Sequence, residues 1–526
     1  MGTKNPCRGR TVCAPYMDSS SRKSDNHITT DFPVRQRFVL DFLTEASIIA
    51  TRSHHFSQEV VPLRRKNDLG RDAIPGLILR VAIPTMLAQF INVLYSIVDR
   101  MFIGHIAGTG GLALAGAGVC GPIISLLSSF SFLVGLGGTP LMATKMGKGD
   151  MEAAAGILSN CFRLLLGMAA GLSVIFFVLR RQFLWWFGAS ADTMPYALDY
   201  ITVYIAGTAF ALLSGGLNSF LIAQGRSGLG MGTVTLGAVL NIALDPVFIF
   251  LLDMGVSGAA WATVLSQAAA CVFVLISLRL PGLPVPLRWG RFQPAVCRRV
   301  LALGLSPFLT YALDSVILII LNTALQGYGG PGEGDTLITC SAIVQSYMLL
   351  IAMPMSGVTL GCQGVVSFNL GAGNEKRVKQ ALAGVLLFCF VFAALMLAAT
   401  QLAAPQFARF FSKDSEIVAR SVGYIKLYTA AALFMAVQWT CVDMSTALGE
   451  VRLALFCSLF RKTLFLGGIL LFPLMFSAPA AFAAEPFCDV TASILSSVLF
   501  WHFLPRCLAE YCRQPAEEMC AKHPAG

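Results

Sequence analysis

The feature that most constrains this chain is a recurring apolar run, each about 20 residues long and able to cross roughly 30 Å of hydrocarbon as a helix. Twelve such segments follow one another, at about 74–103, 113–138, 153–178, 196–224, 231–253, 257–279, 296–325, 336–366, 379–402, 418–447, 452–476 and 480–505. Charged residues make up only 13% of the 526 residues, whereas about 25% is typical of soluble proteins. The pattern predicts an all-α, polytopic membrane protein with twelve transmembrane helices. For most of the chain it excludes a coiled coil, a disordered chain and a secreted disulfide scaffold.

Polar stretches divide the chain into parts. Residues 1–72 are rich in Ser, Thr and Arg and hold no spanning segment, so we expect a disordered cytosolic extension. Five arginines and four prolines interrupt the pattern between the sixth and seventh apolar segments. We therefore predict an N-lobe of six helices at 73–279, a basic cytosolic linker at 280–297, a C-lobe of six helices at 298–505 and a cytosolic tail at 506–526.

The two six-segment halves carry matching residues at a nearly constant spacing. The pairs at an offset of 223 or 224 residues are Pro84 with Pro307, Gly104 with Gly327, Gly147 and Gly149 with Gly371 and Gly373, and Ala223 and Gly225 with Ala447 and Gly449. An even number of helices per repeat gives both halves the same orientation, so an axis along the membrane normal relates them. This parallel internal repeat predicts a cavity between the halves near the midplane, as in a transporter.

The net charge of +10 does not indicate a nucleic-acid partner, because the basic residues sit in loops and at both ends of the chain. Lys and Arg are more frequent in alternate loops, and this bias orients membrane helices with the basic loops inside. Both termini are therefore predicted to be cytoplasmic. The 15 cysteines are scattered through apolar runs with no CxxC spacing, so we expect reduced, buried thiols, no structural metal and no cofactor.

Two acidic residues lie inside apolar segments of the first half, where an Asp at a helix centre costs about 2.5–3.5 kcal/mol on insertion scales. Asp99 lies late in the first segment, four residues after Tyr95. Asp245 lies in the fifth segment, four residues after Asn241. A spacing of four places each pair on one helix face.

Further polar groups of the first half complete the predicted cluster. Pro246 cannot donate to a carbonyl one turn earlier, which leaves that oxygen free beside Asp245. Asn218 in the fourth segment and Thr263 in the sixth add an amide and a hydroxyl. Two carboxylates with these groups could load and release a proton, because burial and mutual repulsion disfavour their charged forms. The same all-oxygen set is suited to Na⁺, and the sequence leaves H⁺ and Na⁺ open.

Two structural interpretations compete with this cation site. The first-half group could be an ordinary buried polar network that fixes helix packing. Asp99 could also form a local ion pair with the adjacent Arg100. No basic residue lies in the fifth segment, so the structural interpretation is weaker for Asp245.

The second half carries its own intramembrane charges. Asp314, Asp443 and Asp489 lie in apolar segments together with Arg461. These acids could line the wall of the cavity and attract a cationic substrate, or Arg461 could neutralise one of them in a structural pair. Glu485, near the start of the last segment, is expected at the interface.

Four long motifs resemble the multidrug and toxic compound extrusion family, MATE. They are NVLYSIVDRMFIG at 92–104, NIALDPVFIF at 241–250, DMGVSGAAWATVLSQ at 253–267 and GVVSFNLGAGNEKRVKQ at 364–380. The likeness covers about residues 67–505 and is greatest to the bacterial and archaeal branch with two N-lobe aspartates. It implies a two-lobe, V-shaped antiporter that expels organic cations in exchange for H⁺ or Na⁺.

The resemblance also implies roles for single residues. The N-lobe cation site of that branch matches Tyr95, Asp99, Asn218, Asn241, Asp245 and Thr263. Pro84 matches a first-helix proline at which bending is proposed to accompany protonation. Asp314 lies near one place of the acidic C-lobe pair of other branches, whereas Asp443 has no clear counterpart there.

The main hypothesis is therefore an efflux antiporter of the bacterial inner membrane, a monomer that handles small organic cations. A cation binds Asp99 and Asp245, the first helix repacks around Pro84, and the lobes rock, with Pro246 as a second helix-bending residue. The first alternative is a flippase for lipid-linked saccharides of the same superfamily, which needs a cationic cavity. A membrane-embedded enzyme or receptor is disfavoured, because the six histidines lie in tails, loops or the last helix end.

Overall fold

The computed structural model describes residues 67–106, 110–330, 333–412 and 414–522, and within them every regular element is helical. The segment 1–66 lies outside the described residues, so the expectation for most of 1–72 is not addressed. The first half contains α2 (Ile74–Gly104), α3 (Gly110–Gly147), α4 (Met151–Trp186), α5 (Met194–Ala206), α6 (Thr208–Ala223), α7 (Ser227–Pro246), the π-helical turn η1 (Val247–Leu251) and α8 (Gly255–Ser277).

The second half has the corresponding elements in the same order. They are α9 (Pro294–Gly329), α10 (Glu333–Gly371), α11 (Glu375–Phe411), α12 (Ser415–Tyr428), α13 (Ala432–Ala447), α14 (Val451–Met475), the 3₁₀ turn η2 (Ala478–Ala483) and α15 (Ala484–Lys522). The last helix continues through residues 506–522, so the boundary predicted at 505 falls inside it.

Among these elements, ten helices are long and apolar enough to cross a membrane, and counting two bent helix pairs as one span each gives twelve. The bent pairs are α5 with α6, at 57°, and α12 with α13, at 48°. They are the fourth span of each half, as the repeat predicts. The predicted all-α architecture with twelve spans is thereby confirmed.

The break between α5 and α6 falls at Gly207, where a side chain has no room. A Cβ atom on Gly207 would lie 2.4 Å from Cγ2 of Val264 on α8. The glycine therefore lets α8 pack directly against the bend. Tyr204 and Thr208, on either side of it, remain buried.

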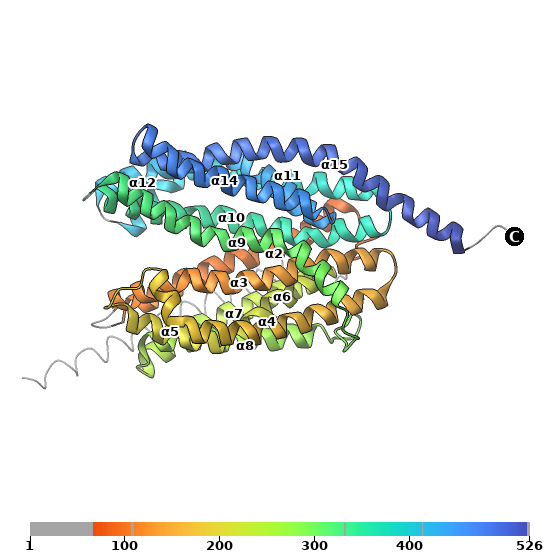
Figure 1. Ribbon diagram of the computed structural model, residues 1–526, viewed down its shortest axis with the longest axis horizontal. Coiled ribbons are helices and arrows are strands. Elements are labelled where there is room, and N and C mark those ends of the chain that lie inside the picture. Colours follow the sequence, from red (N-terminus) through yellow and green to blue (C-terminus); the bar gives the residue numbers. More distant parts are fainter. Residues whose placement is uncertain (1–66, 107–109, 331–332, 413, 523–526) are drawn as a thin grey trace, which may run out of the picture. The chain divides into compact units, whose positions relative to one another are not determined.

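Figure 1 shows α3 to α8 gathered in one group and α9 to α15 in another, with α3 and α9 facing each other. The apolar core of the first group includes Leu158, Leu217 and Phe220. The first turns of α2 instead join the core of the second group, where Leu77 and Val81 are fully buried. The first helix thus belongs to the packing of both halves.

Glycines bring the two halves into backbone contact. A Cβ on Gly304 of α9 would lie 1.7 Å from the carbonyl oxygen of Leu133 on α3, and one on Gly137 of α3 would lie 2.2 Å from the oxygen of Val300. Nearer the helix ends, a Cβ on Gly371 would lie 2.0 Å from the oxygen of Thr144. Such approach between helices is the usual role of small residues in membrane proteins.

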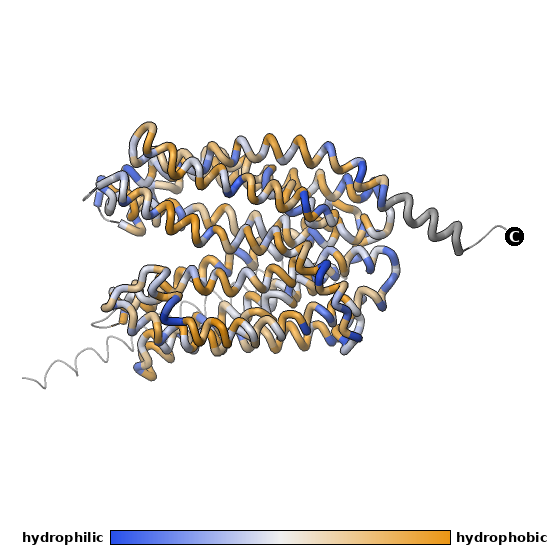
Figure 2. The backbone as a smooth tube through the Cα atoms, in the orientation of Figure 1, coloured by the Kyte–Doolittle hydropathy of each residue, from blue (hydrophilic) through white to orange (hydrophobic). Residues whose placement is uncertain are grey.

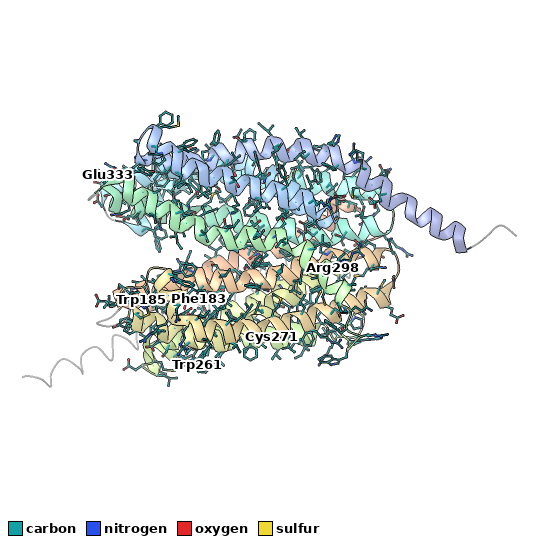
Figure 3. The ribbon with its side chains drawn as sticks, viewed as in Figure 1. Phe183, Trp185, Trp261, Cys271, Arg298 and Glu333 are labelled. Carbon is teal, nitrogen blue, oxygen red and sulfur yellow. The ribbon has the colours of Figure 1, made fainter. Side chains whose placement is uncertain are left out.

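Hydropathy along the chain follows this arrangement. Apolar residues dominate the helices, and hydrophilic ones gather near helix ends (Figure 2). Phe183 and Trp185 lie at the end of the helices opposite to Arg298 of the linker side (Figure 3). A concentration of basic residues at one end of the spanning helices is typical of membrane proteins.

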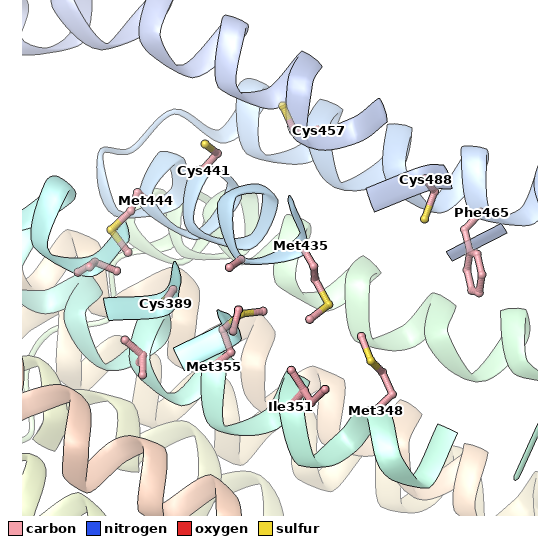
Figure 4. Close-up of a cluster of buried hydrophobic side chains, with 14 of the residues drawn as sticks. Met348, Ile351, Met355, Cys389, Met435, Cys441, Met444, Cys457, Phe465 and Cys488 are labelled. Carbon is pink, nitrogen blue, oxygen red and sulfur yellow. The ribbon is translucent and has the colours of Figure 1, made fainter. Parts of the chain in front are cut away.

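Sulfur-containing side chains fill part of the second core. Figure 4 shows Met348 and Met355 of α10, Met435 and Met444 of α13, and Cys389 of α11 within one buried cluster. The eleven cysteines from Cys120 to Cys507, whose side chains the structure describes, are buried and free of disulfide bonds. The expectation of reduced, buried thiols is confirmed for them.

The loops that follow the second span of each half also repeat. Asp150 caps α4 by accepting a hydrogen bond of 3.0 Å from the backbone N–H of Ala153. Asn374, 224 residues later, caps α11 by accepting one of 3.2 Å from the N–H of Arg377. The hydrogen bond from the Ala153 N–H, together with the charge of Lys145, holds the pKa of Asp150 below its usual range. The caps fix where the third span of each half begins.

Candidate functional site in the first half

A polar cluster lies between α7 and α8. The side-chain amide of Asn241 donates to Oδ1 of Asp245 and to Oγ1 of Thr263, each at 3.3 Å. Asp245 is fully buried and Asn241 is 2% exposed. The structure thus brings together three of the predicted site residues, at the interface of the fifth and sixth spans.

Proline explains the local path of the chain at Asp245. Pro246 ends α7 and has no N–H, and the backbone continues as the π-helical turn Val247–Leu251. Such single turns occur frequently at functional sites. The turn packs closely on α8, where a Cβ on Gly258 would lie 2.7 Å from the carbonyl oxygen of Phe248.

Asp99 and Tyr95 of α2 face the same cluster. The charges of Asp99 and Asp245 act on each other and both act on Tyr95. Two buried tyrosines of α5 border the group: Tyr200 lies near Thr263 and the charge of Asp99, and Tyr204 lies near Gln267 and Ser128. Sequence reasoning missed both tyrosines, although their spacing of four on an apolar helix was a usable signal.

Several oxygens of the cluster are buried and have no hydrogen-bond partner among the described residues. They are Oδ1 of Asp99, Oδ2 of Asp245 and Oδ1 of Asn241. Buried carboxylate oxygens without partners are costly unless a proton or a cation neutralises them. Arg100 is exposed and no contact of ion-pair length joins it to Asp99 in the described part of the chain, although its charge still acts on Asp99.

Asn218 is a correction to the predicted site. Its Oδ1 lies 3.4 Å from where a Cβ on Gly230 would be, at the opposite end of α7 from Asp245. Gly230 precedes Asp245 by 15 residues, which is roughly 22 Å along a helix. Because α6 and α7 form an antiparallel hairpin around Gly225, Asn218 faces the start of α7 and does not join Asp245.

Pro84 lies in the middle of α2, where its ring cannot donate to the carbonyl of Arg80. That carbonyl instead accepts a 3.0 Å hydrogen bond from Oγ of Ser227, the first residue of α7. The next residue, Thr85, lies against α10: its backbone oxygen would be 2.6 Å from a Cβ on Gly357. The predicted bending position therefore contacts both the α7 helix of the cluster and the second half.

The second half holds two separate groups of charges. Oδ2 of Asp443 on α13 accepts a 2.5 Å hydrogen bond from Thr359 of α10. Arg461 of α14 donates to Oε1 of Glu485 at 2.5 Å and to Oδ1 of Asp489 at 2.9 Å, both on α15. The structural-pair interpretation of Arg461 is therefore correct for Asp489. Glu485, the second residue of α15, is 7% exposed and ion-paired, and its expected position at the membrane interface stays a prediction.

Asp314 of α9 is paired with Lys462 of α14. Sequence reasoning did not single out Lys462, although a second basic residue next to Arg461 in an apolar segment was a visible signal. The charges of Asp443 and Asp314 both act on Tyr311 of α9. The second half is thus more polar inside than the sequence suggested.

The MatE family model matches residues 84–247 and 308–467, one block in each half. "Multidrug export protein MepA" of Staphylococcus haemolyticus is 25% identical over 376 residues, covering 71% of this chain and 81% of that protein. The protein of the same name from Staphylococcus aureus (strain NCTC 8325) is 23% identical over 80% of this chain and 93% of its own length.

Solved structures agree on the fold. A structure titled as the outward-facing conformation of a multidrug resistance MATE family transporter matches with a TM-score of 0.78 and 21% identity, over 84% of this chain and 98% of that one. A transporter structure from Pyrococcus furiosus gives the same TM-score at 20% identity and the same coverage. Family members are transporters rather than enzymes. With both halves matched over more than half of its length, the chain is a multi-pass membrane protein that belongs to the MatE family.

Proposed function

We propose that this protein is a secondary active efflux antiporter that exports small organic cations in exchange for H⁺ or Na⁺. The observation that carries the proposal is Asp245, which is fully buried in a spanning helix and has one carboxylate oxygen without a hydrogen-bond partner among the residues that the structure describes. The names of the bacterial relatives, multidrug export proteins, support drug-like substrates.

The cluster has the properties that coupling to a cation requires. Asp99 and Asp245 are close enough for their charges to interact, and repulsion between them is relieved when one binds a proton or both share Na⁺. Asn241 and Thr263 supply neutral oxygens beside the carboxylates. Hard oxygen ligands of this kind accept either ion.

Cation binding would act on the halves through α2. Asp99 lies on the same helix as Pro84, and Thr85 beside it packs against Gly357 and Gly361 of α10. Neutralising Asp99 changes how the far part of α2 packs on α7, and that change reaches α10 at the proline. A difference in cation affinity between the two arrangements supplies the coupling free energy.

The distribution of basic residues supports a proposed orientation of the chain in the membrane. Basic residues cluster in the linker between α8 and α9 and in the loop that begins α11, which favours these sides as cytoplasmic. Both termini would then be cytoplasmic, in a bacterial inner membrane, with the monomer as the working unit. The saccharide-flippase alternative needs free cationic groups, whereas Arg461 and Lys462 are both bound to carboxylates.

Transport into proteoliposomes tests the proposal, with ΔpH and ΔNa⁺ imposed separately on the purified full chain and a fluorescent organic cation as the probe. Asp245→Asn is expected to abolish gradient-driven transport while the protein remains folded by size-exclusion chromatography. Asp253→Asn is the matched control: this Asp is exposed, eight residues away, and its φ of 52° suits Asn. Undiminished transport by Asp245→Asn would contradict the mechanism, and dependence on only one gradient identifies the coupling ion.

A further inference from the structure

The Lys462–Asp314 pair is strongly asymmetric in its exposure. The Lys462 side chain is 9% exposed, whereas the Asp314 side chain is 53% exposed. An incoming molecule can therefore reach the carboxylate but not the ammonium. Asp314 follows Tyr311 by three residues on α9, and the Tyr311 ring packs on Phe132 of α3 with 4.5 Å between centroids. The exposed carboxylate thus lies on the face of α9 that borders the first half.

A second acceptor for the ammonium lies deeper in the same half. Oδ1 of Asp489 is bound by Arg461, but its Oδ2 is buried and has no partner among the described residues. Asp489 is 1% exposed. The charge of Lys462 acts on Asp489 together with those of Arg461 and Glu485, so the ammonium is within electrostatic reach of a buried carboxylate besides the exposed one that it binds.

The charges of this group do not balance. Arg461 and Lys462 carry two positive charges, and Asp314, Glu485 and Asp489 carry three negative charges when ionised. A proton or one further cation would balance the group, because buried charges are costly unless they are neutralised. With Lys462 on Asp314, the uncompensated charge is the buried one on Asp489. With Lys462 on Asp489, it is the accessible one on Asp314, where an external cation can bind.

We propose that Lys462 is an internal counter-ion that an organic cation displaces from Asp314, and that the displaced ammonium moves to the free oxygen of Asp489. This inference rests on the proposed function, since it takes the exported organic cation as the ligand. It assigns a substrate subsite to α9 of the second half, separate from the Asp99–Asp245 cluster. Lys462 then competes with the substrate for Asp314, so removing Lys462 should strengthen substrate binding.

Binding of tetraphenylphosphonium, a permanent organic cation, to the full chain in nanodiscs tests the proposal by equilibrium dialysis. Lys462→Met removes the competitor and should tighten binding by roughly 5- to 150-fold, the usual range of coupling between two sites. Asp314→Asn should weaken binding in both the wild-type and the Lys462→Met background. Asp489→Asn removes the second acceptor and should weaken binding only while Lys462 is present.

The dependence of Asp489→Asn on Lys462 is the decisive readout, because a merely structural role of Asp489 would weaken binding in both backgrounds. Lys379→Met is the matched control, since Lys379 forms a comparable but exposed pair with Glu375 on α11. Lys462→Gln replaces Lys462→Met if the latter does not fold. Unchanged or weaker binding by both Lys462 variants overturns the proposal, as does the absence of binding in the wild type and in these variants.

The outcomes also separate this inference from the proposed function. Loss of transport in Asp245→Asn with unchanged tetraphenylphosphonium binding in Lys462→Met leaves the antiporter intact and overturns only the counter-ion exchange. Full gradient-driven transport in Asp245→Asn contradicts the proposed coupling site, whatever the Lys462 variants show.

Discussion

Gly304 of α9 meets the backbone carbonyl of Leu133 on α3 so closely that a Cβ there would lie 1.7 Å from the oxygen. Neither partner is the end of a flexible side chain, so an added methyl group must move a helix. Overpacking of this kind costs about 1–3 kcal/mol.

We therefore expect Gly304→Ala to lower the thermal unfolding temperature in detergent and to reduce transport, because it wedges the halves apart at α3 and α9. Gly327→Ala is the control on the same helix, since nothing lies within 4 Å of a Cβ there. It should be neutral or slightly stabilising, because Ala favours helix over Gly. Equal behaviour of the two variants would mean that the close approach has no energetic consequence.

The hydrogen bond from Ser227 to the Arg80 carbonyl should matter only because Pro84 leaves that carbonyl free. Ser227→Ala removes the donor and is expected to cost about 1 kcal/mol. In a Pro84→Ala background the helix itself can satisfy the carbonyl, so the same change should cost less. A double-mutant cycle on thermal stability measures the difference, and additive effects would refute the link between the proline and α7.

Removing Arg461 alone from its ion pairs with Glu485 and Asp489 should lower the stability far more than neutralising all three residues together. Arg461→Met leaves Glu485 and Asp489 buried without their cation, a change that typically costs 3–5 kcal/mol. The triple variant with Glu485→Gln and Asp489→Asn should recover much of that loss in a thermal-shift assay. Arg420→Met, which breaks half-exposed pairs with Glu333 and Glu416, should have only a small effect. A triple variant no more stable than Arg461→Met alone would argue against the charge explanation.

Glu450, in the loop between α13 and α14, provides a pH-dependent prediction. Burial, with the charge of Glu510 nearby, raises the pKa of Glu450 above its usual value of 4.5. A raised pKa means that folding favours the protonated form, so at neutral pH the ionised group lowers stability, and this loss disappears as the pH falls below 4.5.

We expect Glu450→Gln to raise the unfolding temperature at pH 7.5 and to have no effect near pH 4. The gain should stay below about 1 kcal/mol, because the side chain is only partly buried and solvent screens it. Glu152→Gln, at an exposed residue in the first turn of α4, controls for the loss of a surface charge. A gain for Glu450→Gln that is the same at both pH values would exclude ionisation as its cause.

The apolar runs were enough to predict twelve spans, because crossing hydrocarbon as a helix requires length and hydropathy and little else. The bends inside the fourth span of each half were not predictable in this way. Gly207 marks one of them through its contact with Val264 on α8, and such tertiary contacts leave no trace in hydropathy.

The candidate site was predictable where residues share a helix face and less so across helices. Asn241 and Asp245 are four apart on α7 and do hydrogen-bond. Asn218 has a suitable side chain, but the register of the α6–α7 hairpin places it against Gly230. The residue type of Asn218 suggested a ligand for the site, but the register of the α6–α7 hairpin decides which residue its side chain contacts.

The short segment before α2 bears on how far the halves can part. Asn67 donates to the carbonyl of Gly225 in the first half at 3.0 Å. Arg377 of the second half donates to the carbonyls of Leu69 and Asp72 at 3.0 and 2.8 Å. A short turn before α2 thus binds both halves at the same end of the helices. Any separation of the halves at that end would have to break the Asn67 bond to the first half or the Arg377 bonds to the second.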